Sequence, residues 1–576
     1  MIEPRPLEQT LRHECGRRAA PARTRSQDRR PNRASGFVLA GLLVVLAQHV
    51  STGQVRDRAA RDADPGTASI SGRVVTGSPP TPLSDADLTV YGQVGRVPAS
   101  ARTDADGRYT ARDLPAGLYT VTARRGGYLQ LQYGQLRSFE PGTPLQLEAG
   151  DTLTGVDFQL PRGAVLTGTV FDQHRQPAVG VRVAAQRYQF ASGRWDMVGI
   201  GRDDSTDDRG VYRLFGLPPG DYYVEASPRL TPGDPTRSGS TYYPNSPDLG
   251  SAQRVSLRAA QERLGIDVSL AFSNTARVSG RVVDASGLPL ASARSVSLVA
   301  RSPSGLRNRS APIQPDGSFV IEGVPPGEFT LYTNTPATEG PVQFAMTDLL
   351  MSGSDREQVV LRTTTGATAT GTIAVAGGID VPFLPDDLQL FTMPMGFAGV
   401  PAGRGIGQVK QDWSFEIHGM GDAQLIRLLG LPDGWELDAV LLNGQDITDQ
   451  PVHLPAGRAT GEFRVVVTDN ATRLHATIVD DAGRPVTDCR VVIFAADETR
   501  WAYPSRFVRA IRPDQHGTID VRGLPTEHYL AFAAPGIERG SETNPEFLDR
   551  ISRTAASFTL GAGETRELTI AVSEPQ

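Results

Sequence analysis

One phrase recurs along this chain and constrains its fold more than any other feature. A turn ending in Gly-x-aromatic is followed, a few residues later, by Leu-Pro-x-Gly-x-aromatic or its Val-Pro form, at residues 106–119, 210–222 and 316–329. The turn glycines stand about 100 residues apart, and a further one, Gly517, leaves room for one more unit before it. Repeats at this spacing predict a tandem array of about five similar domains.

Each copy has the pattern of a β-hairpin followed by a new strand. Asp-Gly supplies the positive φ values that a tight hairpin turn needs, and Pro followed by Gly reverses the chain. In the strand that follows, Tyr119 and Val121 are expected to face the core while Thr120 faces outward. Short strands with frequent turn signals predict an all-β fold of antiparallel, immunoglobulin-like or prealbumin-like β-sandwiches with about seven strands each.

The positions of the repeats also predict the domain boundaries. Domains are expected at residues 67–161, 162–272, 273–364, 365–469 and 470–576, after a leader at 1–47 and a linker at 48–66. The fourth domain is the most divergent, because Trp413 stands at the position of the turn glycine. In the fifth domain Glu527 stands where the Leu-Pro-x-Gly segment of the other copies has glycine, which leaves the type of this turn open.

The N-terminal segment differs in composition from the rest of the chain. Residues 1–35 contain nine Arg and four acidic residues, and residues 37–47 form an uncharged apolar run. This order is typical of a secretory signal peptide, with cleavage expected after residues 45–47. The run is shorter than the ~20 residues that cross a bilayer, so a retained membrane anchor is the alternative. We expect an exported protein that is periplasmic, secreted or on the outer surface, and that contacts a membrane only through this segment if it is uncleaved.

Charge and cysteine content exclude several classes of protein. The net charge of −6 becomes more negative when the basic leader is removed, so nucleic acid is not an expected partner. Lys410 is the only lysine, and we attribute the excess of arginine to base composition rather than to phosphate binding. Cys15 lies in the leader and Cys489 in an apolar strand, so a processed chain has no internal disulfide and no multi-cysteine metal site.

Three segments of the first unit resemble the carboxypeptidase regulatory-like domain: Gly-Arg-Val-Val at 72–75, the turn at 103–109 and Leu-Pro-Ala-Gly-Leu-Tyr at 114–119. That domain is a transthyretin-like β-sandwich grouped with the starch-binding-like, or carbohydrate-binding-like, folds. The resemblance covers the first three units and, less fully, the fifth. The whole chain is similar to large secreted bacterial proteins built from such domains in tandem. The resemblance implies an accessory and interaction module that has no catalytic residues.

Motifs for catalysis do not occur in the sequence. No His is followed by Glu three residues later, and neither His-Glu-x-x-His nor Gly-x-Ser-x-Gly is present. The acidic turns at 104–107 and 203–208 could hold calcium, but they lack the twelve-residue ligand spacing with its terminal Glu. Asp in a hairpin turn is expected without any metal. We therefore predict a protein that is not an enzyme, with no metal site and no cofactor.

Aromatic side chains on loops are the candidate binding residues, because flat rings with polar neighbours can stack on sugars. The candidates are Tyr188, Trp195, Tyr242 and Tyr243 in the second unit, and Trp501 and Tyr503 in the fifth. The alternative is that these rings close the ends of a sandwich or pack against neighbouring units. Two functions follow: an exported scaffold or adhesion protein with a glycan or a cell-surface protein as partner, or a carbohydrate-binding protein of the cell surface.

Overall fold

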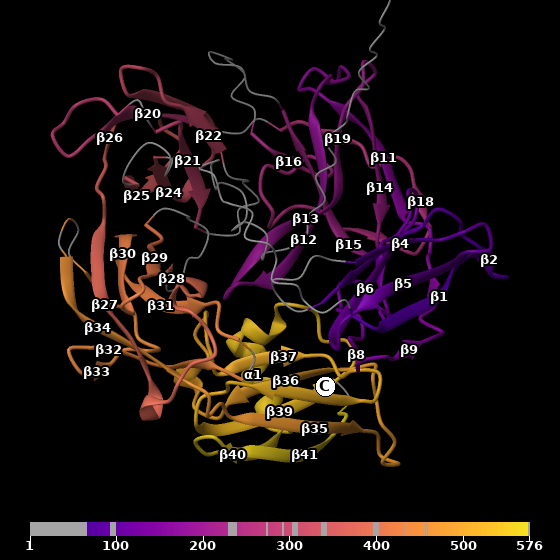
Figure 1. Ribbon diagram of the computed structural model, residues 1–576. Coiled ribbons are helices and arrows are strands. Elements are labelled where there is room, and N and C mark those ends of the chain that lie inside the picture. Colours follow the sequence, from indigo (N-terminus) through magenta and orange to yellow (C-terminus); the bar gives the residue numbers. More distant parts are fainter. Residues whose placement is uncertain are drawn as a thin grey trace, which may run out of the picture. The chain divides into compact units, whose positions relative to one another are not determined.

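The computed structural model describes residues 66–92, 99–228, 239–271, 275–290, 293–301, 309–335, 342–394, 403–432, 434–454, 457 and 459–573 (Figure 1). Every described residue lies in one compact unit, Ala59–Gln576. The predicted leader at 1–47, with its signal peptide or anchor, lies outside the described residues. Within the described part, no helix is long and apolar enough to span a membrane.

Five main hydrophobic cores follow one another along the described chain. Their buried residues fall within 68–160, 164–268, 276–361, 367–467 and 474–570. We refer to the strands around each core as the first to the fifth sandwich. Nearly all regular structure is β-strand, and the predicted all-β class of tandem β-sandwiches is confirmed.

In the first three sandwiches two sheets enclose the core. The first consists of β1 (Ala68–Thr76), β2 (Thr81–Pro82), β5 (Arg108–Leu114), β9 (Thr152–Leu153) and β10 (Phe158–Gln159), facing β3 (Asp87–Tyr91), β4 (Ala99–Arg102), β6 (Gly117–Arg124), β7 (Leu131–Gln132) and β8 (Leu145–Leu147). The second consists of β11 (Ala164–Phe171), β14 (Val211–Leu217), β18 (Glu262–Arg263) and β19 (Val268–Ser269), facing β12 (Arg182–Ala191), β13 (Arg194–Ser205), β15 (Gly220–Ser227), β16 (Thr241–Tyr242) and β17 (Val255–Leu257). The third consists of β20 (Ala276–Val283), β23 (Ser318–Val324) and β26 (Arg356–Arg362), facing β21 (Ser295–Ala300), β22 (Arg309–Pro312), β24 (Gly327–Asn334) and β25 (Phe344–Met351).

The fourth sandwich departs from this plan, because its strands form one continuous sheet around the core. The strand order is β31 (Gln424–Leu429), β28 (Gln389–Pro394), β29 (Ile406–Val409), β30 (Ser414–Met420), β27 (Ala367–Val375), β34 (Ala459–Thr468), β32 (Glu436–Leu442) and β33 (Gln445–Asp446). Strand β29 pairs with both β28 and β30 and so joins the two halves. Two short 3-10 helices, η2 (Ala376–Gly378) and η3 (Pro385–Asp387), complete this sandwich.

The fifth sandwich returns to two sheets and adds a helix. One sheet contains β35 (Arg473–Val479), β38 (Thr518–Arg522) and β41 (Thr565–Ala571), and the other contains β36 (Arg490–Ala495), β37 (Val508–Ile511), β39 (Glu527–Ala534) and β40 (Ala556–Leu560). Two 3-10 helices, η4 (Glu498–Arg500) and η5 (Ser541–Thr543), precede the helix α1 (Pro545–Ser552). Asn544 caps α1 by accepting a hydrogen bond from the Glu546 N–H, and Leu548 and Ile551 pack into a small core with Trp501.

The opening strand of every sandwich makes two kinds of pair. It pairs antiparallel with the strand after the turn and parallel with a strand near the end of the sandwich. The hairpin predicted at this turn is therefore wrong in four sandwiches, because the strand before the turn belongs to the other sheet. Among the described strands, only in the fourth sandwich do the two beside the turn, β29 and β30, pair with each other. Gly72 on β1 shows why a small residue stands in this strand, because a Cβ there would lie 2.0 Å from the carbonyl oxygen of Val156. The closing parallel pair is a feature that the sequence pattern did not predict.

The tyrosine of the Leu-Pro-x-Gly-x-Tyr phrase forms a hydrogen bond within the phrase itself. In three sandwiches the tyrosine hydroxyl donates to the carbonyl of the proline four residues earlier, for Tyr119 and Pro115 at 2.7 Å, Tyr222 and Pro218 at 2.6 Å, and Tyr529 and Pro525 at 2.7 Å. The ring fills the core while its hydroxyl holds the turn. The fifth sandwich keeps this bond although Glu527 replaces the glycine.

Candidate functional site

The second sandwich carries an exposed aromatic cluster on the hairpin of β12 and β13. Phe190 and Trp195 are cross-strand neighbours, and their rings meet edge-on at 5.5 Å between centroids. The Trp195 ring stacks on Tyr188, with 4.9 Å between centroids and 10° between planes. Tyr188 is 39% and Trp195 42% exposed. The hairpin therefore presents two of the predicted stacking residues together, with part of their ring surface open to solvent.

The two other predicted aromatics of the second sandwich face inward. Tyr242 is buried in β16, and Tyr243 is partly buried against the second core. The neighbouring backbone is held by the Tyr243 N–H, which donates to the Val224 carbonyl. Tyr242 and Tyr243 therefore pack against the second sandwich itself, and the ring of Tyr242 has no face open to a sugar.

The two predicted residues of the fifth sandwich also pack against protein. Trp501 is buried edge-on against Phe494, at 5.7 Å between centroids, and its indole N–H donates to the Ala495 carbonyl at 2.7 Å. Tyr503 is partly buried beside Gly193 at the tip of the β12–β13 hairpin, where an added Cβ would lie 2.8 Å from the Tyr503 Cβ. Trp501 and Tyr503 thus contribute to the inside of the fifth sandwich and to its contact with the second.

A polar cavity of about 470 Å³ opens between the fourth and fifth sandwiches. Strand β32 and the segment after β33 line one side, and the turns before β39 and before β41 line the other. Its charged lining residues are Glu436, Asp438, Asp446, Asp449, Arg500, Arg506 and Glu527. Carboxylates outnumber arginines in this cavity, which distinguishes it from the phosphate-binding sites that clusters of basic residues form.

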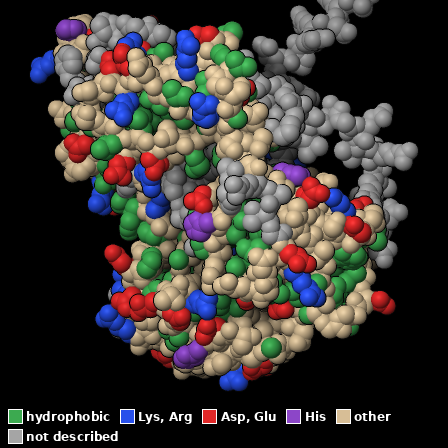
Figure 2. All heavy atoms as spheres, turned by 90° about the vertical axis from the view of Figure 1, so that its left-hand side faces the viewer, with side chains coloured by type: hydrophobic (Ala, Val, Ile, Leu, Met, Phe, Trp, Pro, Cys, Tyr) green, Lys and Arg blue, Asp and Glu red, His purple; other side chains and the backbone are tan. Residues whose placement is uncertain are grey.

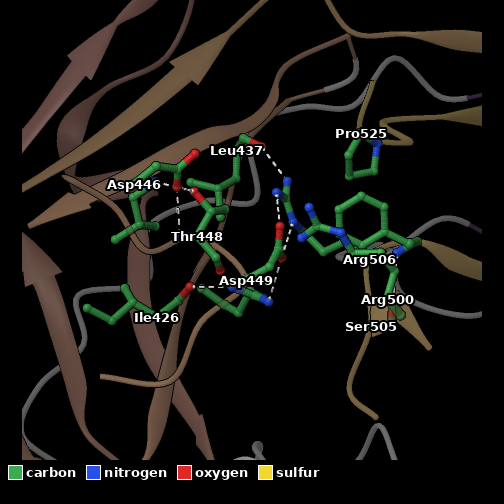
Figure 3. Close-up of polar contacts among 12 residues, drawn as sticks. Ile426, Leu437, Asp446, Thr448, Asp449, Arg500, Ser505, Arg506 and Pro525 are labelled. Carbon is green, nitrogen blue, oxygen red and sulfur yellow. Dashed lines mark hydrogen bonds and ion pairs between the residues drawn. The ribbon is translucent and has the colours of Figure 1, made fainter. Parts of the chain in front are cut away.

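At the side of the cavity, Asp449 pairs with Arg506 (Figure 3) and also with Arg427. Arg506 of the fifth sandwich donates to both Asp449 carboxylate oxygens at 2.8 Å and to the Leu437 carbonyl at 3.2 Å. Arg427 of β31 lies 3.4 Å from the same carboxylate and donates to the Thr448 carbonyl at 2.7 Å. The three charged side chains are only 12% to 19% exposed. This geometry makes a two-pronged, largely desolvated ion pair across the junction.

The electrostatics of the junction follow from burial and from these contacts. Burial alone would raise the pKa of Asp449, but the hydrogen bonds and charge of Arg506 outweigh it and hold that pKa below the usual range. Burial lowers the pKa of Arg427 to about 10, which keeps the guanidinium charged at neutral pH. Burial also raises the pKa of Glu436, which lies farther along the cavity wall. The contacts with Arg506 thus favour the ionised form of Asp449, and this carboxylate ties the two sandwiches together.

Sequence reasoning missed this ion-pair cluster. Arg506 and Asp449 lie 57 positions apart in irregular segments, and neither stands in a recognisable motif. The one available signal is Arg427, a single charge within the otherwise uncharged stretch Gln-Leu-Ile-Arg-Leu-Leu of β31. An arginine at such a place is expected to need a buried partner.

Side chains that could serve catalysis or metal binding take other roles. The Asp104 carboxylate accepts hydrogen bonds from the N–H groups of Asp106 and Arg108, as expected for an Asp that stabilises a turn. His528 Nε2 lies 2.7 Å from Ser557 Oγ, but the pair is exposed, and in the described residues no carboxylate orients the other ring nitrogen. Among the residues that the structure describes, no three His, Cys, Asp or Glu side chains gather as metal ligands.

Fold and site together define a tandem β-sandwich protein whose charged clusters lie between sandwiches. Residues 69–161 match the family of carboxypeptidase regulatory-like domains. This segment, the first sandwich, is a carboxypeptidase regulatory-like domain, and the predicted resemblance is confirmed there. No curated protein sequence matches the chain significantly.

Several solved structures are similar to the chain at low identity. The Bacillus anthracis TIE protein is 8% identical, over 87% of this chain and 72% of its own, with a TM-score of 0.14. A streptococcal ancillary pilin is 14% identical, over 51% of this chain and 98% of its own, with a TM-score of 0.17. The shaft pilin SpaA from Lactobacillus rhamnosus GG is 13% identical, over 36% and 98%, with a TM-score of 0.18. All three TM-scores are far below 0.5, so no functional conclusion is drawn from these likenesses.

Proposed function

We propose that this chain is an exported, non-enzymatic scaffold or adhesion-type protein. Its five domains, with the boundaries predicted from the repeats, present surfaces to protein or cell-surface partners. The N-terminal segment directs export, and the mature protein is periplasmic, secreted or on the outer surface. The fold of the first sandwich supports the proposal, because carboxypeptidase regulatory-like domains are non-catalytic modules.

The observation that carries this proposal is the junction between the fourth and fifth sandwiches. A protein that presents surfaces at a fixed spacing needs rigid connections between its domains. The ion pair of Arg506 and Asp449 is largely buried and two-pronged, and it spans the junction directly. Such a pair has one preferred geometry, whereas a flexible linker would allow many.

The distribution of charge supports a protein or glycan partner over nucleic acid. On the face shown in Figure 2, Lys and Arg side chains are interspersed with acidic and apolar ones. The whole chain has a net charge of −6. Binding to a nucleic-acid backbone requires a continuous basic patch that neutralises several phosphates.

Export of the full chain is the first test of the proposal. The chain, with a C-terminal tag, is expressed in a bacterium, and the cells are fractionated and treated with external protease. We expect a product that lacks the leader and is recovered outside the cytoplasm. Full-length protein confined to the cytoplasm would contradict the proposal.

A second candidate function is carbohydrate binding, and the exposed stack of Tyr188 and Trp195 favours it. A glycan array probed with the wild-type chain and with Trp195→Ala tests this function. Tyr91→Ala is the matched control, since Tyr91 is a 48% exposed aromatic residue of the first sandwich. Retention that Trp195→Ala abolishes and Tyr91→Ala preserves would establish carbohydrate binding. A blank array from folded protein would eliminate the array's sugars as ligands.

A further inference from the structure

A loop of the first sandwich surrounds a buried arginine of the fifth. Arg512, just after β37, donates to the carbonyl of Gly134 at 2.8 Å and to the carbonyl of Pro141 at 2.8 Å. Both carbonyls belong to the segment between β7 and β8, more than 370 positions earlier in the chain. The Arg512 side chain is 4% exposed. We call residues 134–141 the clasp loop.

Carboxylates from both sandwiches complete the surroundings of Arg512. Asp488 of the fifth sandwich lies 3.1 Å from the Arg512 guanidinium, and Glu140 of the clasp loop lies 3.8 Å from it. Arg137 of the clasp loop donates to both oxygens of Asp488 at 3.1 and 3.0 Å. Two arginines and two carboxylates therefore alternate across the contact, and each sandwich supplies one of each charge. Glu140 is only 7% exposed, so its carboxylate lies largely out of water beside the two arginines.

A second, uncharged contact fixes the same two sandwiches. The N–H of Gln146, on β8, donates to the Gln515 side-chain oxygen at 2.8 Å, and the Gln515 side-chain NH₂ donates to the Gln146 carbonyl at 2.8 Å. This reciprocal pair satisfies backbone groups at the edge of β8. The first and fifth sandwiches thus meet at two separate points.

The clasp loop also connects to the second sandwich. The Arg187 guanidinium of β12 lies over the Phe139 ring, 3.7 Å from its centroid. The same guanidinium donates to the Glu538 carboxylate of the fifth sandwich at 3.0 Å. The loop residue Phe139 therefore lies beside an ion pair between the second and fifth sandwiches, where a cation above an aromatic face is favourable.

We propose that the fifth sandwich carries a docking surface, centred on Arg512, whose partner is the clasp loop of the first sandwich of the same chain. The last sandwich thereby holds the first, with Arg512 as the residue that determines binding. Alternating charges and the paired carbonyls give the surface its specificity for this loop. The proposal does not depend on export or on any external partner.

Cysteine cross-linking of the full chain tests this surface. Gln146→Cys and Gln515→Cys are combined with Cys15→Ser, while the buried Cys489 is left in place. A short bismaleimide linker is expected to join the two new cysteines within one chain. In this background Arg512→Ala is expected to lower the yield about tenfold or more, since removing one partner of a buried ion pair is strongly destabilising. Arg522→Ala is the matched control, an arginine of the same sandwich that is 48% exposed and paired with Asp520.

Three outcomes would overturn the proposal. They are an equal yield in Arg512→Ala, an equal loss in Arg522→Ala, and cross-links that form only between two chains and increase with protein concentration. Circular dichroism checks that Arg512→Ala is folded. If it is not, Arg137→Ala takes its place, because this side chain is 43% exposed and reaches Asp488 from the clasp loop. A lower yield in folded Arg137→Ala supports the docking surface, and an unchanged yield contradicts it.

Discussion

Single hydroxyl groups close the turn in three of the sandwiches. Each of Tyr119, Tyr222 and Tyr529 fills a core with its ring and donates its hydroxyl to a proline carbonyl four residues earlier. In the third sandwich Phe329 fills the core without this bond. The aromatic residue of the repeated phrase therefore has two separable roles, packing and hydrogen bonding.

Replacing one of these hydroxyls tests the second role. Tyr222→Phe keeps the ring but removes the bond to Pro218, and we expect a loss of about 1 kcal/mol in local stability. Native-state hydrogen exchange of the β15 amides measures this loss. Tyr223→Phe is the control, because that hydroxyl accepts only an exposed hydrogen bond from Arg254. An equal effect of both substitutions would refute a specific role for the buried hydroxyl.

The single cysteine of the described chain gives a second prediction at this scale. Burial raises the pKa of the Cys489 thiol from 9.0 to about 12. Because the thiolate is the reactive form, we expect alkylation at pH 8 to be about a thousandfold slower than for an unperturbed thiol. The unfolded chain ionises this thiol near pH 9 while the folded chain keeps it neutral, so its contribution to stability is lost as the pH rises above 9. Rapid labelling of the native protein by iodoacetamide would contradict this burial.

At the scale of elements, the opening strands of the first four sandwiches are each restricted at one glycine by a neighbouring backbone carbonyl. Gly72 of β1 lies so close to the Val156 carbonyl oxygen that an added Cβ would be 2.0 Å away. The same close approach recurs for Gly168, Gly280 and Gly371, each against a backbone carbonyl at 1.9 to 2.1 Å. The glycine of these four opening strands is thus a packing requirement of the neighbouring backbone, whereas β35 of the fifth sandwich contains no glycine.

Enlarging this glycine tests the restriction. We expect Gly72→Ala to destabilise the first sandwich by about 2 kcal/mol, since a rigid backbone carbonyl must move to admit the methyl group. Gly126→Ala is the matched control, because an added Cβ there meets nothing within 4 Å. Hydrogen exchange of the β1 and β5 amides provides the measurement. If the β1 amides were equally protected from exchange in both variants, the backbone at Val156 could move away from Gly72 at no cost and the prediction would be wrong.

Sequence reasoning predicted those elements whose signals are local. The Asp-Gly turns, the Pro-Gly reversals and the alternation after Tyr119 predict turns and a core-facing strand, and the structure has these turns and this strand. The predicted hairpin is wrong in four sandwiches, because the strands on either side of the Gly-x-aromatic turn belong to different sheets. The helix α1 was missed because it is only eight residues long, although Asn544 followed by Pro545 is a signal for a helix start. The continuous sheet of the fourth sandwich depends on β29 pairing on both sides, which no local pattern encodes.

The candidate sites show the same division. Tyr188 and Trp195 were found because both belong to one hairpin, whose two strands bring their rings together. Trp501, like Trp195, is a tryptophan with a tyrosine nearby in the sequence. However, its ring packs on Phe494 and its N–H donates to the Ala495 carbonyl, so Trp501 lies inside the sandwich. Whether an aromatic residue is exposed depends on its neighbours in space, and these cannot be read from its neighbours in sequence.

At the scale of the whole molecule, arginines connect sandwiches that are distant in the sequence. Arg506 joins the fourth and fifth, Arg512 the first and fifth, and Arg187 the second and fifth. Base composition is the expected cause of the excess of arginine in the whole chain, yet these three side chains have specific partners. Their planar guanidinium groups suit two-pronged and stacked contacts that lysine cannot reproduce.

The junction of the fourth and fifth sandwiches gives a prediction at this scale. Asp449→Asn leaves Arg427 and Arg506 facing each other without a carboxylate, and we expect a loss of about 3 kcal/mol. Hydrogen exchange in β32 and β37 measures the loss. Asp438→Asn is the matched control, an exposed carboxylate of the same cavity, and it is expected to change little. An Asp449→Asn variant as stable as this control would show that the ion pair does not hold the junction.

The same carboxylate sets the acid sensitivity of the junction. The pKa of Asp449 is lowered below its ordinary value of 3.8 in the folded chain, so its stabilising contribution is complete above that value. The contribution is lost as the pH falls below 3.8 and through the folded pKa. We expect wild-type protection in β32 and β37 to fall with acid in this range, and Asp449→Asn to lack this component.

The most direct test of the scaffold proposal is cross-linking in the cell envelope. Because Lys410 is the only lysine, a dihydrazide linker used with a carboxyl-activating coupling reagent suits this chain better than an amine-reactive linker. The exported wild-type protein is cross-linked in intact cells, and its covalent adducts are identified by mass spectrometry. The account predicts adducts with other envelope proteins that recur at the same carboxylates and are competed by purified chain. Recovery of the exported protein without any protein adduct, together with Trp195-dependent retention on a glycan array, would contradict the scaffold function and favour carbohydrate binding.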